Sequence, residues 1–245
     1  MYHNKKVIVV MPAFNAALTL EKTVNEIPEW VDEVILTDDA STDNTVAVAQ
    51  KLGIQHILKH DQNKGYGGNQ KTCYNKALAL EGDIIIMLHP DYQYTPKLIP
   101  SMVNLIAQDL YPVVLGSRIL GKGALRGGMP WYKYLANRLL TFIQNVLIDQ
   151  KLSEYHTGYR AFSKGALKAI NFNDNSDDFI FDNQMLAQLV YKDFEIAEVT
   201  CPTKYFEEAS SINFKRSAVY GLGCMLVSIQ FRLNKWGILK LAMFK

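Results

Sequence analysis

Short apolar runs rich in β-branched residues alternate with helical patterns through the first half of the chain, and this alternation constrains the fold most. A parallel connection between two strands needs a crossover of a dozen or more residues, and a helix supplies it. Strands that alternate with helices along the chain are therefore expected to run parallel. The runs are apolar throughout, as expected for strands buried on both faces. We therefore predict an α/β fold with a mostly parallel sheet flanked by helices. The predicted strands are residues 5–12, 32–39, 54–60, 83–89 and 112–118.

The second half of the chain is less regular. It contains a helical pattern at 131–149, a short strand leading into a helix at 157–167, a helix at 179–193 and a strand at 194–202. Because no linker is evident, we predict one domain over 1–208, followed by a basic, apolar helical segment over 209–245. One apolar stripe marks the helix at 131–149 and consists of Leu135, Leu139, Phe142, Ile143, Val146 and Leu147.

Charge and cysteine content exclude several classes of protein. The 26 basic and 24 acidic residues give a net charge of +2, which argues against a nucleic-acid-binding protein. Three distant cysteines without a C-x-x-C pair indicate neither zinc nor disulfides and are typical of the reducing cytosol. The uncharged run 217–231 is shorter than the roughly 20 residues of a membrane span. We expect it to form a buried or an interfacial helix.

Polar residues follow three of the predicted strands. They are Pro12 to Asn15, the pair Asp38 and Asp39, and His89 to Gln93. In open parallel sheets ligands bind beyond the carboxyl ends of the strands, so we expect these groups to share one cleft. The Asp pair can accept hydrogen bonds from a base and a ribose, or it can cap the next helix instead.

The segment "HPDYQ" predicts a divalent-metal site. His89, Asp91 and Gln93 lie on one side if the segment stays extended, and an imidazole favours manganese over magnesium. Alternatively, His89 bonds the backbone and Asp91 begins a turn. Two glycine-rich segments, 60–70 and 120–130, offer further phosphate contacts, although neither carries a P-loop signature. Hydrolase signatures of the G-x-S-x-G and H-E-x-x-H types are absent from the sequence.

Taken together, "MPAFNA", "ILTDDASTDNT", "NKGYGGNQ", "HPDYQ", "GSR" and "TGYRAFSKGAL" resemble the motifs of family 2 glycosyltransferases in order and spacing. The resemblance covers about residues 5–205 and is strongest toward the dolichyl-phosphate mannosyltransferase and polyprenyl-phosphate glycosyltransferase branch. It implies an A-type glycosyltransferase fold, a nucleoside-diphosphate sugar donor and a divalent metal, Mn²⁺ or Mg²⁺. His89 replaces the first Asp of the family's D-x-D motif.

The resemblance also implies roles for individual residues. The residues matched to donor binding are Pro12, Asn15, Asp38, Asp39 and Gly65. The residues matched to the metal are His89, Asp91 and Gln93. Arg118, in "GSR", matches an arginine that meets phosphate and is expected to take part in catalysis. Both uridine and guanosine donors remain open, as does the identity of the sugar.

The predicted reaction transfers a sugar by single displacement with inversion at the anomeric carbon. A lipid-phosphate acceptor needs no general base, because its second pKa of about 6 leaves it ionised at pH 7. The cations expected to position such an acceptor are Arg118, Lys122, Arg126, Arg160 and Lys204. An acceptor hydroxyl, as on a polysaccharide, needs a base. Asp182 is the candidate for that role.

We therefore predict a transferase acting on a polyprenyl-phosphate type lipid in cell-envelope glycan synthesis. It would be cytoplasmic and peripheral on the inner face of the membrane, which the segments 131–149 and 209–245 would contact. Packing of these segments in the core or against a second copy is the alternative, and a homo-oligomer or a membrane partner subunit is compatible with it. A polysaccharide hydroxyl acceptor remains open. So does a non-catalytic nucleotide-binding protein, because His89, Ala16 and Ala17 depart from the family pattern.

Overall fold

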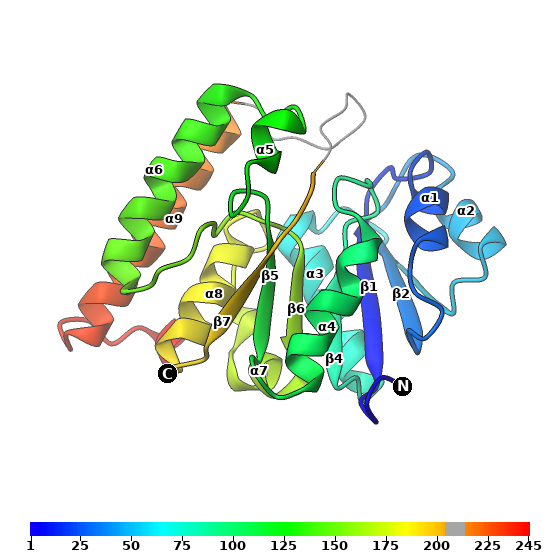
Figure 1. The fold of residues 1–245 in the computed structure, drawn as a ribbon, viewed down its shortest axis with the longest axis horizontal. Helices are drawn as coiled ribbons and strands as arrows, with labels where there is room; N and C mark the ends of the chain where they lie inside the picture. Colours follow the sequence, from blue (N-terminus) through cyan, green and yellow to red (C-terminus); the bar gives the residue numbers. More distant parts are fainter. Residues whose placement is uncertain (204–213) are drawn as a thin grey trace.

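The structure, a computed structural model, describes residues 1–203 and 214–245. The described residues form a seven-stranded sheet in the order β3-β2-β1-β4-β6-β5-β7 (Figure 1). Only β6 is antiparallel to its neighbours, so the predicted α/β fold with a mostly parallel sheet is confirmed. The strands are β1 (Val7–Ala13), β2 (Glu33–Asp38), β3 (His56–Lys59), β4 (Ile84–Met87), β5 (Val113–Ser117), β6 (Arg160–Ser163) and β7 (Ile196–Thr200).

Strand β1 shows why the apolar runs form the centre of the sheet. All seven of its residues are buried, and successive side chains point to opposite faces. Val7 and Val9 join the apolar cluster on one face, whereas Ile8 and Val10 join the cluster on the other. A strand covered on both faces gains from apolar residues at every position, which explains the uninterrupted run in the sequence.

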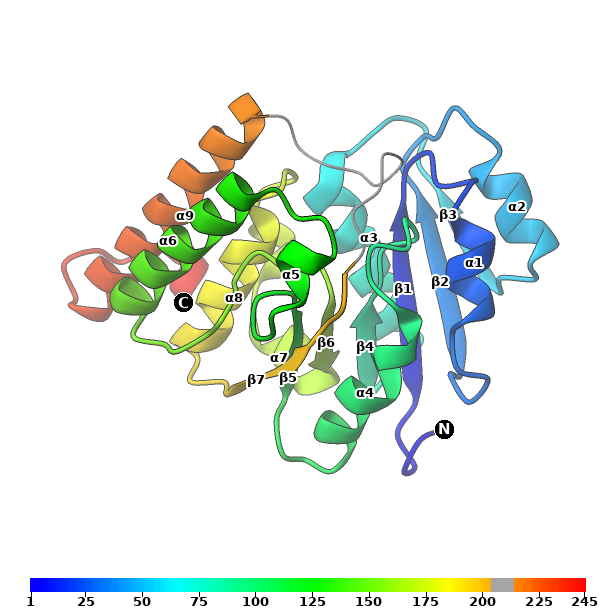
Figure 2. The same ribbon diagram turned by 45° about the horizontal axis from the view of Figure 1, so that its top comes forward.

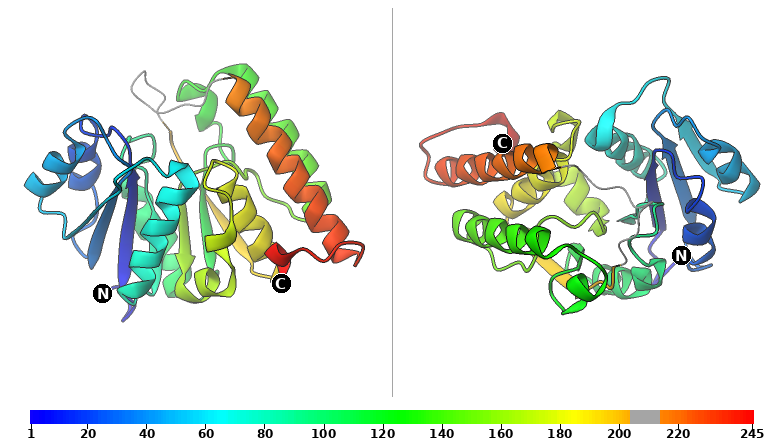
Figure 3. Two further views of the ribbon diagram at one scale, coloured as in Figure 1. Left: turned by 180° about the vertical axis from the view of Figure 1, so that it is seen from behind. Right: turned by 90° about the horizontal axis from the view of Figure 1, so that it is seen from above.

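Helices cover both faces of the sheet (Figures 2 and 3). One face carries α1 (Leu20–Asn25), α2 (Thr45–Lys51), the 3₁₀ turn η1 (Pro96–Leu98) and α4 (Ile99–Ala107). The other face carries α3 (Gly65–Ala79), α7 (Lys164–Ala169), the 3₁₀ turn η2 (Phe172–Asp174), α8 (Phe181–Tyr191), α9 (Phe214–Lys235) and the 3₁₀ turn η3 (Ala242–Phe244).

The direction of β6 determines which loops lie together at the carboxyl ends of the parallel strands, which we call the working edge of the sheet. It lies between β4 and β5 and runs opposite to both. Its amino end therefore lies beside the carboxyl ends of those two strands. Residues 154–160 consequently reach the same edge as residues 88–93 and 117–118. The connection from β5 to β6 runs through α5 (Gly123–Arg126) and α6 (Trp131–Ile148).

Helices α6 and α9 lie side by side at one end of the molecule (Figure 3). The Arg232 guanidinium on α9 donates a 2.7 Å hydrogen bond to the Leu147 carbonyl on α6. On its other side α9 packs Val227 and Phe231 into the main core, and the Phe244 ring lies tilted by 35° against Tyr191 with ring centroids 4.9 Å apart. The C-terminal segment is thus packed on the domain. Its predicted boundary at 208/209 lies outside the described residues.

Most of the apolar stripe of α6 faces outward, although Ile143 and Leu147 are half-buried. The side chains turned toward the protein are Thr141, Gln144 and Ile148. The described part of the chain contains no helix that is both long and apolar enough to span a membrane. The α6 side chains that remain 60–66% exposed are Leu135, Leu139, Phe142 and Val146.

Candidate active site

A cleft of about 330 Å³ opens at the carboxyl ends of β1, β2 and β4. Its walls come from the loops after these strands, the first turn of α3, the segment before α8 and the start of α9. Six of the sequence-predicted residues line it: Pro12, Asn15, Asp39, Gly65, His89 and Asp91. The wall does not include the other predicted residues that the structure describes, namely Asp38, Gln93, Arg118, Lys122, Arg126, Arg160 and Asp182.

Asp39 joins three segments at the floor of the cleft. One of its oxygens, Oδ1, accepts hydrogen bonds from the Lys64 amide at 2.8 Å and bonds the His60 ring at 2.7 Å. The other oxygen, Oδ2, accepts from the Gly65 amide at 3.1 Å. The Asp39 side chain is only 4% exposed, so Asp39 shapes the cleft by anchoring the start of α3. Its neighbour Asp38 is fully buried and accepts from the Ser41 amide.

Asn15 holds the loops after β1 and β2 together. Its backbone adopts a left-handed conformation with φ of 51°, which asparagine tolerates better than most residues. The Asn15 side-chain oxygen accepts from the Thr42 backbone amide at 2.9 Å, while the Asn15 backbone amide donates to the Ser41 hydroxyl at 2.9 Å. The predicted donor-binding residue therefore positions the wall on which a donor would rest.

The glycines of the segment 60–70 allow close packing. Gly65, Gly67 and Gly68 lie in the first turn of α3, and the Gly67 amide donates to the Asp177 carbonyl at 2.7 Å. A Cβ on Gly67 would lie 2.4 Å from the carbonyl oxygen of Ser176. Because the Gly67 and Gly68 amides both donate to the Asp177 carbonyl, the comparison with a phosphate-cradling loop is not supported at Gly67.

His89 and Asp91 reach the cleft, but Gln93 does not. Tyr92 has a φ of 57°, and the Gln93 amide donates to Asp91 at 3.1 Å. This turn breaks the extended alternation that the prediction assumed. Burial lowers the pKa of His89, although the charges of Asp91 and Asp182 act in the opposite direction. A neutral imidazole with an available lone pair suits a metal ligand.

The donor set fits a divalent ion that shares its ligands with a substrate. Within the described residues there is no group of three or more His, Cys, Asp or Glu side chains that could hold a metal by itself. His89 and Asp91 would supply two ligands, and a bound diphosphate would complete the coordination with water. An imidazole and a carboxylate together suit Mn²⁺.

Asp182 lies behind the cleft and is fully engaged. Its Oδ1 accepts from the Gln70 amide group at 3.1 Å, and its Oδ2 accepts from the Tyr66 hydroxyl at 2.8 Å. The Arg160 guanidinium lies 3.6 Å from Oδ2, and the Asp182 side chain is 8% exposed. Because both oxygens are occupied, the proposed base cannot reach an acceptor hydroxyl in this arrangement.

Two of the predicted phosphate-binding arginines are committed to the protein. Arg160 is fully buried in β6 and donates to the carbonyls of Tyr155, Thr157 and Asp182. The structure therefore does not support a direct phosphate contact for Arg160. Arg118 forms an ion pair with the fully buried Glu154. Burial would raise the pKa of Glu154, but the Arg118 charge and hydrogen bonds outweigh it and lower that pKa.

The wall of the cleft does not include the two other predicted cations that the structure describes. Lys122 and Arg126 are exposed at either side of the short helix α5. This loop is fixed by its own small cluster of Ile119, Ala124 and Met129. Lys204 lies outside the described residues.

The cleft also contains residues that the sequence analysis missed. Tyr66 and Asn69 come from α3, Phe179 precedes α8, and Arg216 lies in the first turn of α9. Arg216 bonds Asp178 at 3.3 Å and covers the Phe179 ring. The concentration of basic residues after residue 209 was the only signal for Arg216. Tyr66 was concealed within the glycine-rich segment.

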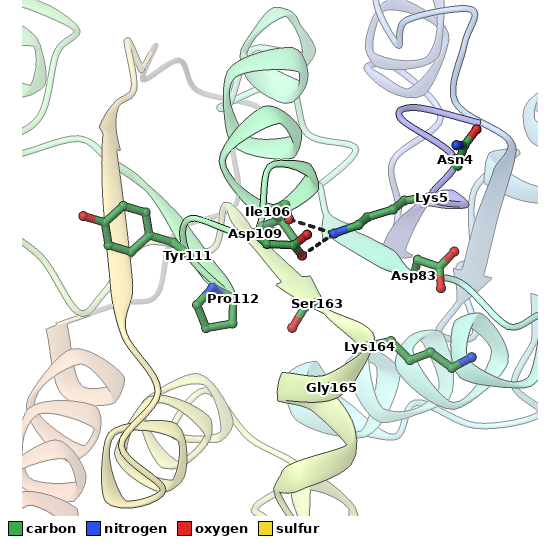
Figure 4. Close-up of a pocket in the computed structure, with 10 residues that line it drawn as sticks. All are labelled: Asn4, Lys5, Asp83, Ile106, Asp109, Tyr111, Pro112, Ser163, Lys164 and Gly165. Carbon is green, nitrogen blue, oxygen red and sulfur yellow. Dashed lines mark hydrogen bonds and ion pairs between the residues drawn. The ribbon is translucent and has the colours of Figure 1, made fainter.

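A second cavity of about 350 Å³ lies at the opposite edge of the sheet. Figure 4 shows Lys5 reaching toward Asp109 and the Ile106 carbonyl, so its charge is already paired there. Lys164 is paired with Glu81. This cavity lies beyond the amino ends of the parallel strands, where ligands of such sheets do not normally bind.

Comparison with known sequences identifies the family. Residues 8–170 match the sequence profile of Glycosyl transferase family 2. The chain belongs to this family. It is a glycosyltransferase, and the motifs that indicated the family in the sequence contribute the cleft-lining residues Asn15, Asp39, His89 and Asp91.

Two relatives cover most of the chain. An uncharacterized protein of Methanocaldococcus jannaschii is 30% identical over 207 residues, which cover 84% of this chain and 84% of that protein. The UDP-N-acetylglucosamine–dolichyl-phosphate N-acetylglucosaminyltransferase of Methanococcus voltae is 29% identical over 221 residues, which cover 83% of this chain and 88% of that enzyme. The second relative agrees with the polyprenyl-phosphate branch that the sequence motifs indicated.

Solved structures establish the A-type glycosyltransferase fold. Glucosyl-3-phosphoglycerate synthase from Mycobacterium tuberculosis in complex with phosphoglyceric acid has a TM-score of 0.72 at 19% identity, covering 93% of this chain and 80% of that chain. The same synthase in complex with Mn²⁺, UDP and glucosyl-3-phosphoglycerate has a TM-score of 0.68 at 17% identity, with the same coverage.

Proposed function

We propose that this glycosyltransferase moves a sugar from a uridine diphosphate sugar to a polyprenyl-phosphate type lipid, with inversion and with a divalent metal. Family membership supports the reaction class. The printed name of the Methanococcus voltae relative joins a UDP-sugar to a dolichyl phosphate. The structural neighbours were solved with UDP and with Mn²⁺ or Mg²⁺.

The cleft offers contacts for each part of such a donor. Phe14 and Leu18 are 53% and 87% exposed at its wall, where they can pack against a base. Arg216 contributes a positive charge for the diphosphate. His89 and Asp91 would hold the metal, which when bound stabilises the negative charge of the leaving diphosphate. Their place in the cleft supports this assignment.

The proposal of a lipid-phosphate acceptor rests on the hydrogen bonds and assigned roles that already occupy the carboxylates in and behind the cleft wall. Asp39 and Asp91 are the acidic side chains in the described wall of the cleft. Asp39 is occupied by His60 and two amides, Asp91 is assigned to the metal, and Asp182 is occupied behind the wall. An acceptor hydroxyl needs a base, whereas a phosphate is already an anion. This arrangement therefore favours the phosphate.

Paired acceptors test this proposal. The purified protein would receive radiolabelled UDP-N-acetylglucosamine, Mn²⁺ and either a short polyprenyl phosphate or the matching polyprenol. Label should transfer to the phosphate and not to the alcohol. Equal or greater transfer to the polyprenol, or to a polysaccharide, would refute the proposed acceptor. Because the sugar is open, other UDP-sugars and GDP-mannose would be assayed in parallel.

We further propose that α6 and α9 rest on an anionic membrane surface. We define the outer face by the exposed side chains of Leu135, Leu139, Phe142 and Val146 on α6, and of Val219, Leu222, Leu226 and Ile229 on α9. The inward side of α6 includes the polar Gln144, which bonds Ser228 on α9, whereas the inward side of α9 also holds the apolar Val227 and Phe231. An apolar face of this kind needs an apolar occupant.

The positive charge of α6 and α9 favours an anionic lipid surface, rather than a second copy of the chain, as the occupant of the outer face. Neither helix contains an acidic residue, whereas both contain basic ones. Two copies would bring like charges together, whereas the cytoplasmic leaflet offers negative charge worth about 1 kcal/mol for each nearby cation. The basic residues of these helices and the tail are Lys133, Arg138, Lys215, Arg216, Arg232, Lys235, Lys240 and Lys245.

Vesicle flotation separates these two occupants of the outer face. The protein should float with vesicles containing phosphatidylserine, float less with neutral vesicles, and fail to float when Leu139→Asn and Leu226→Asn are combined. If light scattering instead shows a wild-type dimer that this double variant abolishes, without vesicle binding, the outer face belongs to a second copy and the membrane proposal is wrong.

A further inference from the structure

Tyr66 joins the metal side of the cleft to the buried carboxylate behind it. Its hydroxyl lies 3.1 Å from Nε2 of His89 and donates to Oδ2 of Asp182 at 2.8 Å. The Tyr66 and His89 rings are nearly parallel, with an angle of 19° between them. Tyr66 itself lines the cleft. The three side chains therefore form one continuous chain of hydrogen bonds.

The direction of this chain follows from what Asp182 can do. The Asp182 carboxylate also accepts from Gln70 and lies beside the Arg160 guanidinium, both of which are donors. An ionised carboxylate has no proton to donate. The Tyr66 hydroxyl must therefore donate its single proton to the hydrogen bond with Asp182.

The proton position on His89 follows in turn. Since the Tyr66 proton points to Asp182, the Tyr66 oxygen can only accept from the His89 ring. The proton of a neutral His89 is then on Nε2, and the lone pair is on Nδ1. Within the described residues Nδ1 makes no hydrogen bond. The partner of one ring nitrogen commonly decides which nitrogen binds a metal.

We propose that Tyr66 is a positioning residue that, together with Asp182, keeps the His89 proton on Nε2 and thereby presents Nδ1 to a divalent metal beside Asp91. The inference rests on the proposed metal-dependent function and adds the residue that orients its histidine ligand. It also gives a role to the acidic residue that the sequence marked as a base. Asp182 acts here through Tyr66.

The backbone around the ring makes room for this arrangement. A Cβ on Gly158 would lie 2.5 Å from Nε2 of His89 and 3.3 Å from the Tyr66 oxygen. Gly158 precedes β6, so the antiparallel strand brings a glycine to a place where a side chain would displace the imidazole. The Gly158 backbone and the Tyr66 hydroxyl thus both lie against the Nε2 edge of the His89 ring.

The proton position can be measured without metal or donor. Long-range ¹H–¹⁵N NMR correlation of wild-type protein at pH 8 distinguishes the two neutral tautomers of His89. The expected spectrum shows a protonated Nε2 and an unprotonated Nδ1. In Tyr66→Phe this preference should be lost, whereas Tyr191→Phe, which removes a hydroxyl bonded to Asn234 far from the cleft, should retain it. A wild-type His89 protonated on Nδ1 would overturn the inference.

Metal affinity provides the second measurement. Titration of Mn²⁺ by electron paramagnetic resonance, in the presence of UDP, should show a 10- to 100-fold weaker affinity in Tyr66→Phe and none of this loss in Tyr191→Phe. Unchanged Mn²⁺ affinity in Tyr66→Phe would overturn the positioning role while leaving the proposed function standing. Absence of Mn²⁺ binding to the wild-type protein, despite the expected tautomer, would overturn the proposed function and the metal role of His89 together.

Discussion

At the residue scale, the site is built from side chains that also hold the fold together. The side-chain oxygens of Asp39, Asn15 and Asp182 accept hydrogen bonds from amides and hydroxyls of neighbouring segments. The sequence could place Asp39 and Asp91 in one cleft, because both follow strands of a parallel sheet. It could not show that Gln93 turns away, because that depends on the positive φ of Tyr92.

The arginines show a second limit of sequence analysis. Arg160 was predicted to bind phosphate because it is a cation within a family motif. In the structure it is fully buried at the start of β6, between β4 and β5, and bonded to three carbonyls. Whether an arginine faces a ligand or the core depends on strand order and direction, which a pattern of charges does not encode.

His156 yields a prediction about pH and stability. Its Nδ1 lies 2.9 Å from the Tyr220 hydroxyl, and burial lowers its pKa to about 4 despite the raising effect of Glu154. The unfolded chain takes up a proton here near pH 6.5, so lowering the pH favours unfolding from that point down to about 4. Between pH 7.5 and 5.5 the wild-type protein should lose about 1 kcal/mol that His156→Asn does not lose.

Urea unfolding at the two pH values measures this difference. His3→Asn, which replaces an exposed histidine, serves as the control and should follow the wild type. If His156→Asn lost as much stability between pH 7.5 and 5.5 as the wild type, His156 would not be held neutral by the fold.

At the scale of elements, the strands were the most predictable part. Each of the five strands expected in the first half is present, because an uninterrupted apolar run has few alternatives in a sheet covered on both faces. The direction of β6 could not be predicted, since its four residues carry no sign of it. That direction decides which loops share the working edge of the sheet.

The outward stripe of α6 was also beyond the sequence. The periodicity correctly predicts a helix with one apolar side, but the side that faces the protein holds Thr141 and Gln144. A neighbouring helix with matching polar groups makes this inversion possible, as the bond from Gln144 to Ser228 shows. The pairing of α6 with α9 depends on packing between segments far apart in the sequence.

The start of α3 provides a prediction about packing. In Gly67→Ala the new methyl would lie 2.4 Å from the Ser176 oxygen and 2.7 Å from Cβ of Phe181, so we expect a loss of about 1–3 kcal/mol in unfolding free energy. Gly123→Ala, in helix α5 with no atom within 4 Å of the added Cβ, is the matched control. It should be neutral or stabilise by up to about 1 kcal/mol.

Thermal and urea denaturation would compare the two variants. Equal stabilities would mean that the segment 176–177 can shift away from α3 at no cost. The structure argues against this, because the Asp177 carbonyl accepts from the Gly67 amide at 2.7 Å.

At the scale of the whole molecule, the cleft and the outer face are distinct surfaces joined by α9. Arg216 in its first turn lines the cleft, whereas Leu222, Leu226 and Ile229 further along belong to the outer face. The proposed lipid acceptor would approach from the membrane side while the donor occupies the cleft beyond β1, β2 and β4. A mutation in the outer face should therefore abolish membrane binding without changing nucleotide binding in the cleft.

The double variant Leu139→Asn with Leu226→Asn tests this separation. It should lose vesicle binding and retain the wild-type affinity for UDP and Mn²⁺, because neither residue lies in the wall of the cleft. Calorimetry and flotation on the same preparation measure both. Parallel loss of nucleotide affinity and vesicle binding would show that the outer face supports the fold of the site.

Calorimetric titration of UDP with and without Mn²⁺, on wild type and on Asp91→Asn, tests the central claim that the cleft is a metal-dependent nucleotide site. Asp91→Asn preserves the size of the side chain and removes its charge. In the wild type Mn²⁺ should strengthen UDP binding at least about tenfold, a difference of about 1.4 kcal/mol, and in Asp91→Asn this gain should disappear. UDP affinity that is indifferent to Mn²⁺ in the wild type, or a gain that survives in Asp91→Asn, would contradict the account.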